Sequence, residues 1–387
     1  MHKRNGLHVA LGLTAIAGWL LFILGCTGWS SWSPDGSKIL FTYIMEQDGQ
    51  KALSVALFDR NTSEARTLFR CPDDDSPCIG QWRQDGASAL VFAKEEGRSG
   101  FSVFDVPTAA GGVIKRIATI ENSDGLIPPI PEVNGFLYLN GNPTTRLDLN
   151  TGAVQVFPET DQPVLYNWTS GRMLYGISHA CDDSDKSHCR IEIGEMTAGG
   201  DSRNQLFEIA MSDPALHNPK DIALMISTDP ERERFALVTE HQEHDQILLY
   251  DRGGLQRVLK PKFPAGQFRL GNLQWARDGQ SIYASVMHPL DNGDTQWSMA
   301  QISLRSGSVH LVPLTTIRGH IDLGEFYLVC QISLSPDGQT LAASSGLCEA
   351  DKISSADRGL FLIDVDSHDG QRITKIPMSS FVPTATQ

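Results

Sequence analysis

The chain has 387 residues, of which 41% are hydrophobic and 20% are charged, and its formal net charge is −14. This composition is ordinary for a soluble globular protein and excludes a disordered chain or a multi-span membrane protein. The negative charge argues against nucleic-acid binding, because phosphate backbones are gripped by clustered Lys and Arg and no basic stripe follows the first few residues.

The N-terminus has the order of an export signal. A positive segment at His2–Arg4 precedes the uncharged, largely apolar run Leu7–Leu24. The run ends in ILGC, which resembles a bacterial lipobox and implies that Cys26 is lipidated and becomes the first residue of the mature chain. The alternative for residues 1–26 is an uncleaved signal anchor, since a span needs about 20 apolar residues. Both alternatives place the rest of the chain outside the cytoplasm, tethered to a membrane of the cell envelope.

A turn motif recurs along the rest of the chain. Four copies are clear and three are weaker, in chain order Trp32–Ser37, Gln81–Gly86, Glu132–Gly135, Asn167–Gly171, Ser227–Pro230, Gln274–Gly279 and Ser333–Gly338. They are spaced about 36 to 60 residues apart, close to the period of roughly 40–50 residues of propeller blades. In the SPDG form, Pro fixes φ, Asp bonds the local backbone and Gly supplies a positive φ. Each copy therefore predicts a tight turn between two strands.

A second hairpin follows each copy of the turn. Its members are Leu57–Thr62, Val103–Val106, Leu147–Gly152, Ile191–Ile193, Leu249–Gly254, Ile302–Gly307 and Leu362–Val365. Two hairpins per repeat give four antiparallel strands, which make one propeller blade. We therefore predict an all-β fold, a seven-bladed β-propeller of four-stranded antiparallel blades over residues 27–377, with residues 378–387 as a C-terminal tail.

The motif combination resembles a known repeat. SPDG, a hydrophobic strand and an xxDxxTG-like hairpin are similar to the WD40-like PD40 repeat of TolB-type propellers, which also builds the propellers of prolyl-oligopeptidase-type peptidases. The resemblance covers essentially the whole chain after Cys26. It implies the fold and, from the TolB-type proteins, protein–protein work in the envelope. Trp32 opens a blade almost directly after Cys26, so a helper domain like that of TolB is not expected, and a role in the Tol system does not follow.

The other six cysteines form three couples that are close in sequence. In an oxidising compartment we predict them to be disulfides, joining Cys71 to Cys78, Cys181 to Cys189 and Cys330 to Cys348. Their spacing is too wide for the gap of two to four residues in structural zinc sites.

The motifs of catalysis are missing from the sequence. A peptidase of the oligopeptidase type would need a G-x-S-x-G elbow and a hydrolase domain, and the chain has neither. The competing hypothesis is a carbohydrate-active or metal-dependent, lyase-like enzyme that uses the central channel, with candidate ligands His179, His241, His244, His288 and His320. His241 and His244 lie between two apolar segments, where a solvated hairpin tip is the favoured explanation.

Acidic segments offer the oxygen ligands that calcium prefers, at Asp73–Asp75, Asp182–Asp185 and Asp291–Asp294. None has EF-hand spacing, so we favour solvated loops. Two of the three lie inside predicted disulfide loops, which would display them to a partner at a lowered ordering cost.

Tryptophans recur at one position of the repeat, which predicts that they form the core between blades. They are Trp32, Trp82, Trp168 and Trp275. Trp29 and Trp297 fall outside this register, and Trp297 either stacks on a ligand or packs under its own loop.

These patterns favour a non-enzymatic, membrane-tethered propeller whose loops bind another cell-envelope protein. We expect no catalytic residue, no metal and no cofactor. The alternatives are the channel enzyme described above and a purely structural subunit of a larger envelope assembly.

Overall fold

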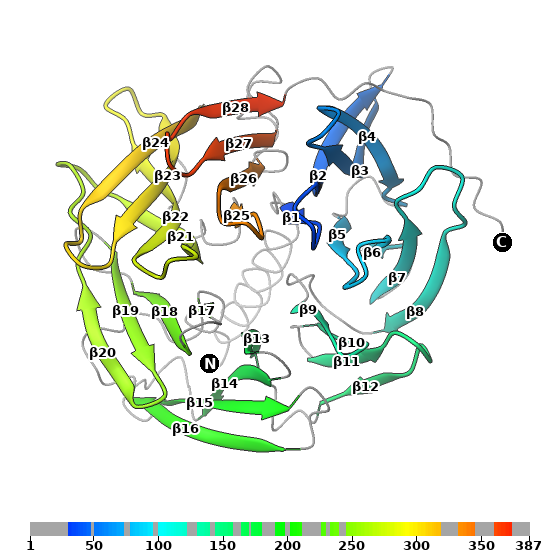
Figure 1. Ribbon diagram of the computed structural model, residues 1–387, viewed down its shortest axis with the longest axis horizontal. Coiled ribbons are helices and arrows are strands. Elements are labelled where there is room, and N and C mark those ends of the chain that lie inside the picture. Colours follow the sequence, from blue (N-terminus) through cyan, green and yellow to red (C-terminus); the bar gives the residue numbers. More distant parts are fainter. Residues whose placement is uncertain are drawn as a thin grey trace, which may run out of the picture.

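The described residues form seven antiparallel sheets, each of four consecutive strands. The computed structural model describes residues 30–47, 50–72, 78–95, 100–121, 130–139, 144–157, 164–169, 172–179, 190–197, 202–210, 226–229, 233–239, 245–318, 332–344 and 360–373. The sheets stand as blades around one axis (Figure 1), which confirms the predicted seven-bladed β-propeller. Within the described ranges the chain has no helix, and so none that is long and apolar enough to cross a membrane.

The first three blades come from the N-terminal half of the described chain. Blade 1 comprises β1 (Ser30–Trp32), β2 (Lys38–Gln47), β3 (Gln50–Asp59) and β4 (Glu64–Arg70). Blade 2 comprises β5 (Cys78–Trp82), β6 (Ser88–Lys94), β7 (Gly100–Pro107) and β8 (Lys115–Glu121). Blade 3 comprises β9 (Ile130–Val133), β10 (Phe136–Leu139), β11 (Thr145–Asp148) and β12 (Val154–Val156).

The remaining four blades repeat the same order. Blade 4 comprises β13 (Val164–Thr169), β14 (Arg172–His179), β15 (Arg190–Thr197) and β16 (Arg203–Ala210). Blade 5 comprises β17 (Ile226–Asp229), β18 (Arg234–Thr239), β19 (Gln246–Asp251) and β20 (Gly254–Leu259). Blade 6 comprises β21 (Arg269–Trp275), β22 (Ser281–Pro289), β23 (Thr295–Ser303) and β24 (Val309–Ile317). Blade 7 comprises β25 (Ile332–Leu334), β26 (Thr340–Ser344), β27 (Leu360–Asp364) and β28 (Gly370–Ile373).

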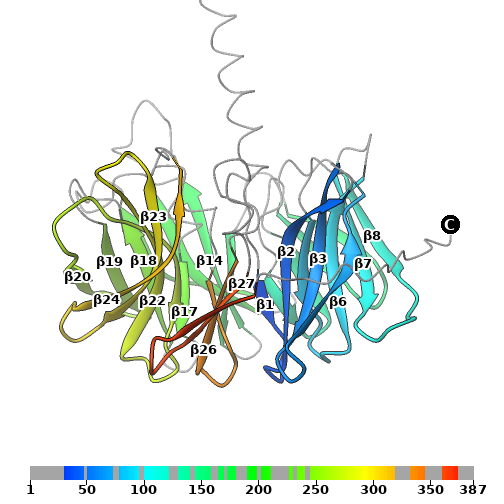
Figure 2. The ribbon, with the colours of Figure 1, turned by 90° about the horizontal axis from the view of Figure 1, so that it is seen from above.

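Both predicted turns of every repeat fall on the same face of the ring. In each blade the first strand is nearest the axis and the fourth is outermost (Figure 1), and the chain reverses between successive strands. The turns between the first and second strands and between the third and fourth strands therefore share one face, which we call the turn face. Figure 2 shows the ring edge-on, with these turns at the bottom. The opposite face, which carries the other connections, is the loop face.

The clear copies of the repeated turn have one hydrogen-bond pattern. In blade 1 the Gly36 N–H donates to the Ser33 carbonyl (2.9 Å), and Asp35 Oδ1 accepts the Ser37 N–H (3.0 Å). A positive φ, between 60° and 74°, is shared by the four turn glycines, Gly36, Gly86, Gly279 and Gly338. This left-handed conformation is cheap only for glycine, which explains the fixed last residue of the motif.

The hydrophobic core is divided among the blade interfaces. Each of the seven interfaces between neighbouring blades holds its own cluster of buried side chains, including the interface between blades 7 and 1. Leu40 faces blade 2, whereas its neighbours Ile39 and Phe41 face blade 7. A strand buried on both faces reads as a continuous apolar run rather than an alternating one, as in the KILF that opens β2.

The ring closes between its first and last blades by side-chain contacts. Among the described strands, none is shared between blade 1 and blade 7. Instead, the hydroxyls of Ser30 and Ser333 lie 2.9 Å apart, and Trp32 Nε1 donates to the Ser333 carbonyl (3.0 Å). We call this interface between blades 7 and 1 the seam.

Candidate functional site at the seam of the ring

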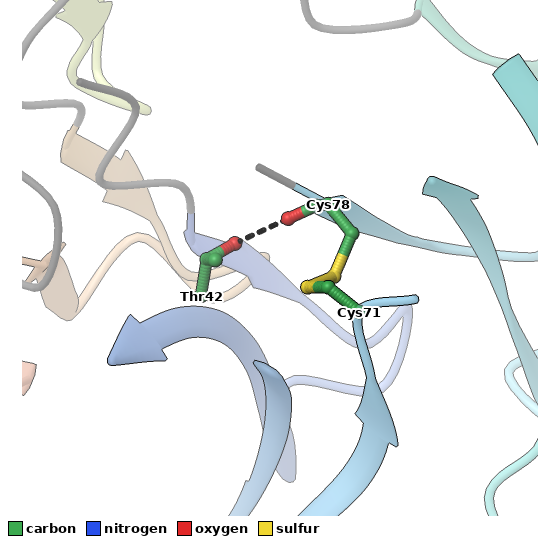
Figure 3. The surroundings of a disulfide bond; sticks show 3 residues. All are labelled: Thr42, Cys71 and Cys78. Atoms are coloured by element: carbon green, nitrogen blue, oxygen red, sulfur yellow. Dashed lines mark hydrogen bonds between the residues drawn. A yellow bond between two sulfur atoms is a disulfide. The ribbon is translucent and has the colours of Figure 1, made fainter. Parts of the chain in front are cut away.

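A disulfide joins Cys71 to Cys78, with their Cα atoms 5.8 Å apart (Figure 3). It links the end of β4 in blade 1 to the start of β5 in blade 2. Both cysteines are buried, the Cys71 N–H donates to the Leu53 carbonyl (2.8 Å), and Thr42 Oγ1 donates to the Cys78 carbonyl (3.0 Å). The base of the connection between these blades is therefore fixed by one covalent bond and two hydrogen bonds.

Many of the other residues singled out in the sequence lie outside the described residues. They are Cys26, Trp29, Asp73–Asp75, Cys181, Asp182–Asp185, Cys189, His241, His244, His320, Cys330 and Cys348. For His179 and Trp168, only the backbone is described. The lipidation site, two of the predicted disulfides and most candidate metal ligands stay predictions.

His288 is the candidate channel ligand whose surroundings are described. Its ring packs on Phe268 with centroids 4.7 Å apart, and its Nδ1 is buried with no hydrogen-bond partner among the described residues. Burial lowers the pKa of His288, which favours the neutral ring. Asp291 lies in the exposed connection that follows β22. Over the described ranges, no three His, Cys, Asp or Glu side chains are grouped so that they would hold a metal ion.

The recurring tryptophans lie between blades, as predicted for the three whose side chains are described. Trp82 Nε1 donates to the Ser31 carbonyl of the preceding blade (2.9 Å), and Trp275 Nε1 does the same to Ser227 (2.9 Å). Trp297 is also fully buried, and it packs edge-on against Phe361 with ring centroids 5.9 Å apart. Trp297 therefore belongs to the core between blades 6 and 7 and is not a ligand-stacking surface.

One register position on the outermost strand reaches the next blade in three places. In blade 1, Arg66 pairs with Leu57 and donates to the Thr108 carbonyl of blade 2. In blade 5, Arg257 pairs with Leu249. Its guanidinium donates to the Leu304 carbonyl of blade 6 (2.6 Å). We call this the latch position, because its side chain ties the outer strand of one blade to the third-to-fourth-strand turn of the next.

Blade 6 uses a histidine at the same position. His310 pairs with Gln301 across β23 and β24, and its ring lies against the ring of His368 in blade 7, with centroids 4.0 Å apart. His368 is in the turn between β27 and β28, has a positive φ of 62°, and its Nε2 lies 2.8 Å from Gln301 Oε1. Three latch positions therefore bridge to the following blade with a long or aromatic polar side chain.

At the seam the latch position holds Gln371, which pairs with Leu362. Glutamine is shorter than arginine and cannot carry a guanidinium fork across the interface. An open groove of about 340 Å³ lies between the two blades here, lined by Phe58, Arg60, Ser63, Thr340, Leu362, Asp364 and Asp369. We call it the seam groove. Its residues come from the third strands of blades 1 and 7, from the turns that follow these strands, and from Thr340 at the start of β26.

Arg60 is the cation of the seam groove, and its charge is already shared. Its guanidinium donates to Thr340 Oγ1 (3.2 Å), lies 3.8 Å from Asp337 Oδ2, and sits 5.3 Å from the centre of the Trp32 ring. Hydrogen bonds from the Ser335 hydroxyl and a backbone N–H lower the pKa of Asp337, and Arg60 adds to this effect. Arg60 therefore faces an ionised carboxylate across the interface.

Two carboxylates, Asp364 and Asp369, stand on the blade 7 side of the groove and are exposed. Asp364 Oδ1 accepts the N–H groups of Asp366 (3.0 Å) and Ser367 (2.8 Å). These hydrogen bonds, led by that from Ser367, lower the pKa of Asp364. Within the described residues, neither Asp364 nor Asp369 is paired with a lysine or arginine. The groove thus combines a buried apolar floor at Phe58 with an excess of negative charge at its rim.

The sequence reasoning missed the seam groove. Its carboxylate Asp364 belongs to a motif that was read only as a hairpin. The signal was the residue at the latch position, which is arginine in blades 1 and 5 and glutamine in blade 7. That signal becomes visible only when strand register is known.

Comparison with known proteins supports the fold and no closer relationship. No protein-family model matches the chain. No curated protein matches it either. The β-propeller domain of the Trilobed protease from Pyrococcus furiosus is similar in structure, with a TM-score of 0.57 and 12% identity over 93% of this chain and 99% of that one. A chain of the Mitotic Checkpoint Complex has a TM-score of 0.52 and 13% identity over 84% and 85%.

TolB from Acinetobacter baumannii is also among the similar structures, with a TM-score of 0.43 and 13% identity over 72% of this chain and 64% of that one. The two matches with TM-scores above 0.5 show that the propeller fold is shared, and at identities of 12% and 13% they say nothing of activity. The Pyrococcus domain is described as having an open velcro topology.

Proposed function

We propose that this chain is an exported, membrane-tethered β-propeller that binds a partner protein in the cell envelope and catalyses no reaction. The tether is the N-terminal segment that ends at Cys26. The propeller supplies a rigid body, because every interface of the ring has its own buried cluster.

The observation that carries the proposal is the seam groove. Its volume of about 340 Å³ is at the low end of the range of roughly 300–1,000 Å³ for small-molecule pockets. The groove is open to solvent, whereas a pocket for a small substrate encloses most of its ligand. An open groove with an apolar floor and a charged rim suits side chains that project from a partner protein.

The disulfide supports the same function at the other face. It joins the two cysteines that bound the short acidic sequence CPDDDSPC. Fixing the ends in advance lowers the entropy that the segment loses when a partner orders it.

The test is purification of the full-length tethered protein from membranes of its own host after mild crosslinking. The intact masses of bait and partners are then measured. We expect a bait that is cleaved before Cys26 and carries lipid, together with one envelope protein in stoichiometric amount. A Cys26→Ser variant is the matched control and should lose the lipid mass. An uncleaved bait that carries a bound metal and no partner would overturn the proposal.

A further inference from the structure

The seam groove has a charge pattern that selects its ligand. Among the described residues that line the groove, Arg60 is the one cation, and it is shared with Thr340 and Asp337. Asp364 and Asp369 are left without a lysine or arginine partner among the described residues. The local excess is therefore negative, as is the formal net charge of the whole chain, −14.

The groove also has an apolar floor. Phe58 is 2% exposed and belongs to the cluster at the seam, and Leu362 packs against that cluster while remaining partly accessible. Lysine and arginine carry an apolar stem that buries against such a surface while the charged head stays at a polar rim. A glutamate or a purely apolar side chain would satisfy only one of these two features.

We propose that the seam groove is a docking site for a lysine or arginine side chain presented by an extended segment of the partner protein. The aliphatic stem lies on Phe58 and Leu362, and the cationic head pairs with Asp364 and Asp369. This inference rests on the proposed binding function and assigns the chemistry of the partner at one surface.

The position of the two carboxylates favours a cation over an anion. Asp364 is oriented by two backbone N–H groups of its own turn, so its charge is held in place rather than swinging freely. An anionic ligand would have to displace Arg60 from Asp337 and would then face the carboxylates of Asp364 and Asp369. Like charges that close are unfavourable even at the surface, whereas a cation gains from both carboxylates at once.

The experiment uses capped, fluorescein-labelled peptides and the purified propeller that carries its natural disulfides. The probe is Ala-Lys-Ala-Lys-Ala, and versions with arginine, glutamate or norleucine in place of lysine are compared by fluorescence anisotropy at low ionic strength. We expect the lysine and arginine peptides to bind and the other two to bind at least tenfold more weakly. Binding should weaken as the salt concentration is raised from about 20 to about 200 mM, because dissolved ions screen solvent-exposed ion pairs.

Variants locate the site. Asp364→Asn with Asp369→Asn should weaken lysine-peptide binding at least tenfold, and the amide at 364 still accepts the turn N–H groups. Asp291→Asn with Glu121→Gln removes the same charge from exposed positions outside the groove and should change binding less than twofold. Arg60→Gln should strengthen binding of the lysine peptide, because a competing cation is removed. Equal binding of the glutamate peptide, or unchanged binding by the Asp364→Asn/Asp369→Asn variant, would overturn the inference.

The same double variant separates this inference from the proposed function. If it still captures the stoichiometric envelope partner as well as the unchanged protein does, the groove is not the docking site, although the protein remains a binding module. If even the unchanged protein captures no partner, the binding function itself is wrong, and lysine-peptide binding would then be an unused property of the seam.

Discussion

The interface between blades 5 and 6 and the seam between blades 7 and 1 have the same tryptophan contacts near the axis, but other polar contacts that cross the two interfaces differ. In both, a tryptophan of the first strand donates to a backbone carbonyl of the preceding blade, at 2.9 Å from Trp275 and 3.0 Å from Trp32. In both, an arginine lies over that tryptophan, Arg234 at 4.7 Å and Arg60 at 5.3 Å from the ring centre.

The two interfaces differ in the polar contacts that cross them. Between blades 5 and 6, Arg257 crosses to the Leu304 carbonyl, and the buried carboxylate of Asp245 accepts from Arg269 (3.0 Å) and the Leu270 N–H (2.7 Å). At the seam, the position that corresponds to Arg257 is Gln371, and a groove is present. The two interfaces thus share the same arrangement of strands but differ in the residue at the latch position, and the groove lies at the seam.

The largest expected effect comes from breaking the sealed interface. Asp245→Ala removes a fully buried acceptor and leaves Arg269 and the Leu270 N–H without it. Because loss of one member of a buried ion pair leaves an uncompensated charge, we expect a loss of about 3 kcal/mol in the free energy of unfolding, measured by urea denaturation.

Arg60→Ala at the seam is the contrasting variant. Its side chain is 34% exposed and its ion pair with Asp337 is long, at 3.8 Å, so we expect a loss below about 1 kcal/mol. Equal losses for the two variants would show that the seam is sealed as tightly as the interface between blades 5 and 6.

The second prediction concerns the covalent link between blades 1 and 2, which the seam lacks among its described residues. The Cys71→Ser/Cys78→Ser variant should lose about 2.5 kcal/mol, the value that the chain-entropy model gives for so short a loop. The variant is preferred to a reductant, because the two other predicted disulfides would also open. Unchanged urea denaturation would mean that the disulfide contributes nothing to the stability of the ring.

The third prediction concerns the acid stability of the repeated turn, which has a serine before its aspartate in blade 1 and an alanine at that position in blade 6. Hydrogen bonds from the Ser33 hydroxyl first, and then from Ser37, lower the pKa of Asp35 to about 2. The folded pKa lies below the usual value of about 3.9, so this carboxylate stabilises the fold above pH 4, and that stabilisation is lost as the pH falls toward 2. The equivalent turn of blade 6 has Ala276 in place of Ser33 and offers no such hydroxyl.

Ser33→Ala tests this account of the turn. It should raise the pKa of Asp35 toward the usual value and make the protein unfold at a higher pH on acidification. The unfolded fraction is measured by circular dichroism from about pH 5 to about pH 1.5, a range that includes the pKa of Asp35 in the folded protein. An unchanged acid midpoint would assign acid stability to other carboxylates.

The fold could be predicted because its signals are local. The Asp-Gly turns require a positive φ that only glycine supplies cheaply, and the same spacing of Trp32, Trp82 and Trp275 from those turns marks the first strand of a blade. Each such signal is contained in a few consecutive residues, so the chain can be divided into blades without knowledge of their arrangement in space.

The site could not be predicted because it depends on register across a turn of variable length. Four residues separate the paired Asp59 and Glu64 in blade 1, whereas two residues separate Asp251 and Gly254 in blade 5, where a register shift follows. Counting along the sequence therefore does not align Arg66 with Arg257. The groove also requires the first and the last blade to be in contact, and a local turn motif carries no information about that contact.

The smallest expected effect is also the sharpest test of the comparison, since it exchanges the two latch residues. Gln371→Arg gives the seam the residue that crosses between blades 5 and 6, and Arg257→Gln does the reverse. A hydrogen bond from arginine to a turn carbonyl contributes about 1 kcal/mol at a partly exposed site. The free energy of unfolding should therefore rise by up to that amount in Gln371→Arg and fall by it in Arg257→Gln.

Gln371→Arg should also weaken lysine-peptide binding, because its guanidinium occupies the groove and competes for Asp364 and Asp369. A gain in stability with unchanged peptide binding would place the new side chain outside the groove and separate sealing of the seam from ligand recognition. A loss of peptide binding with no change in stability would mean that arginine at this position repels the ligand without bridging the blades, and the latch would then be specific to the turn of blade 6.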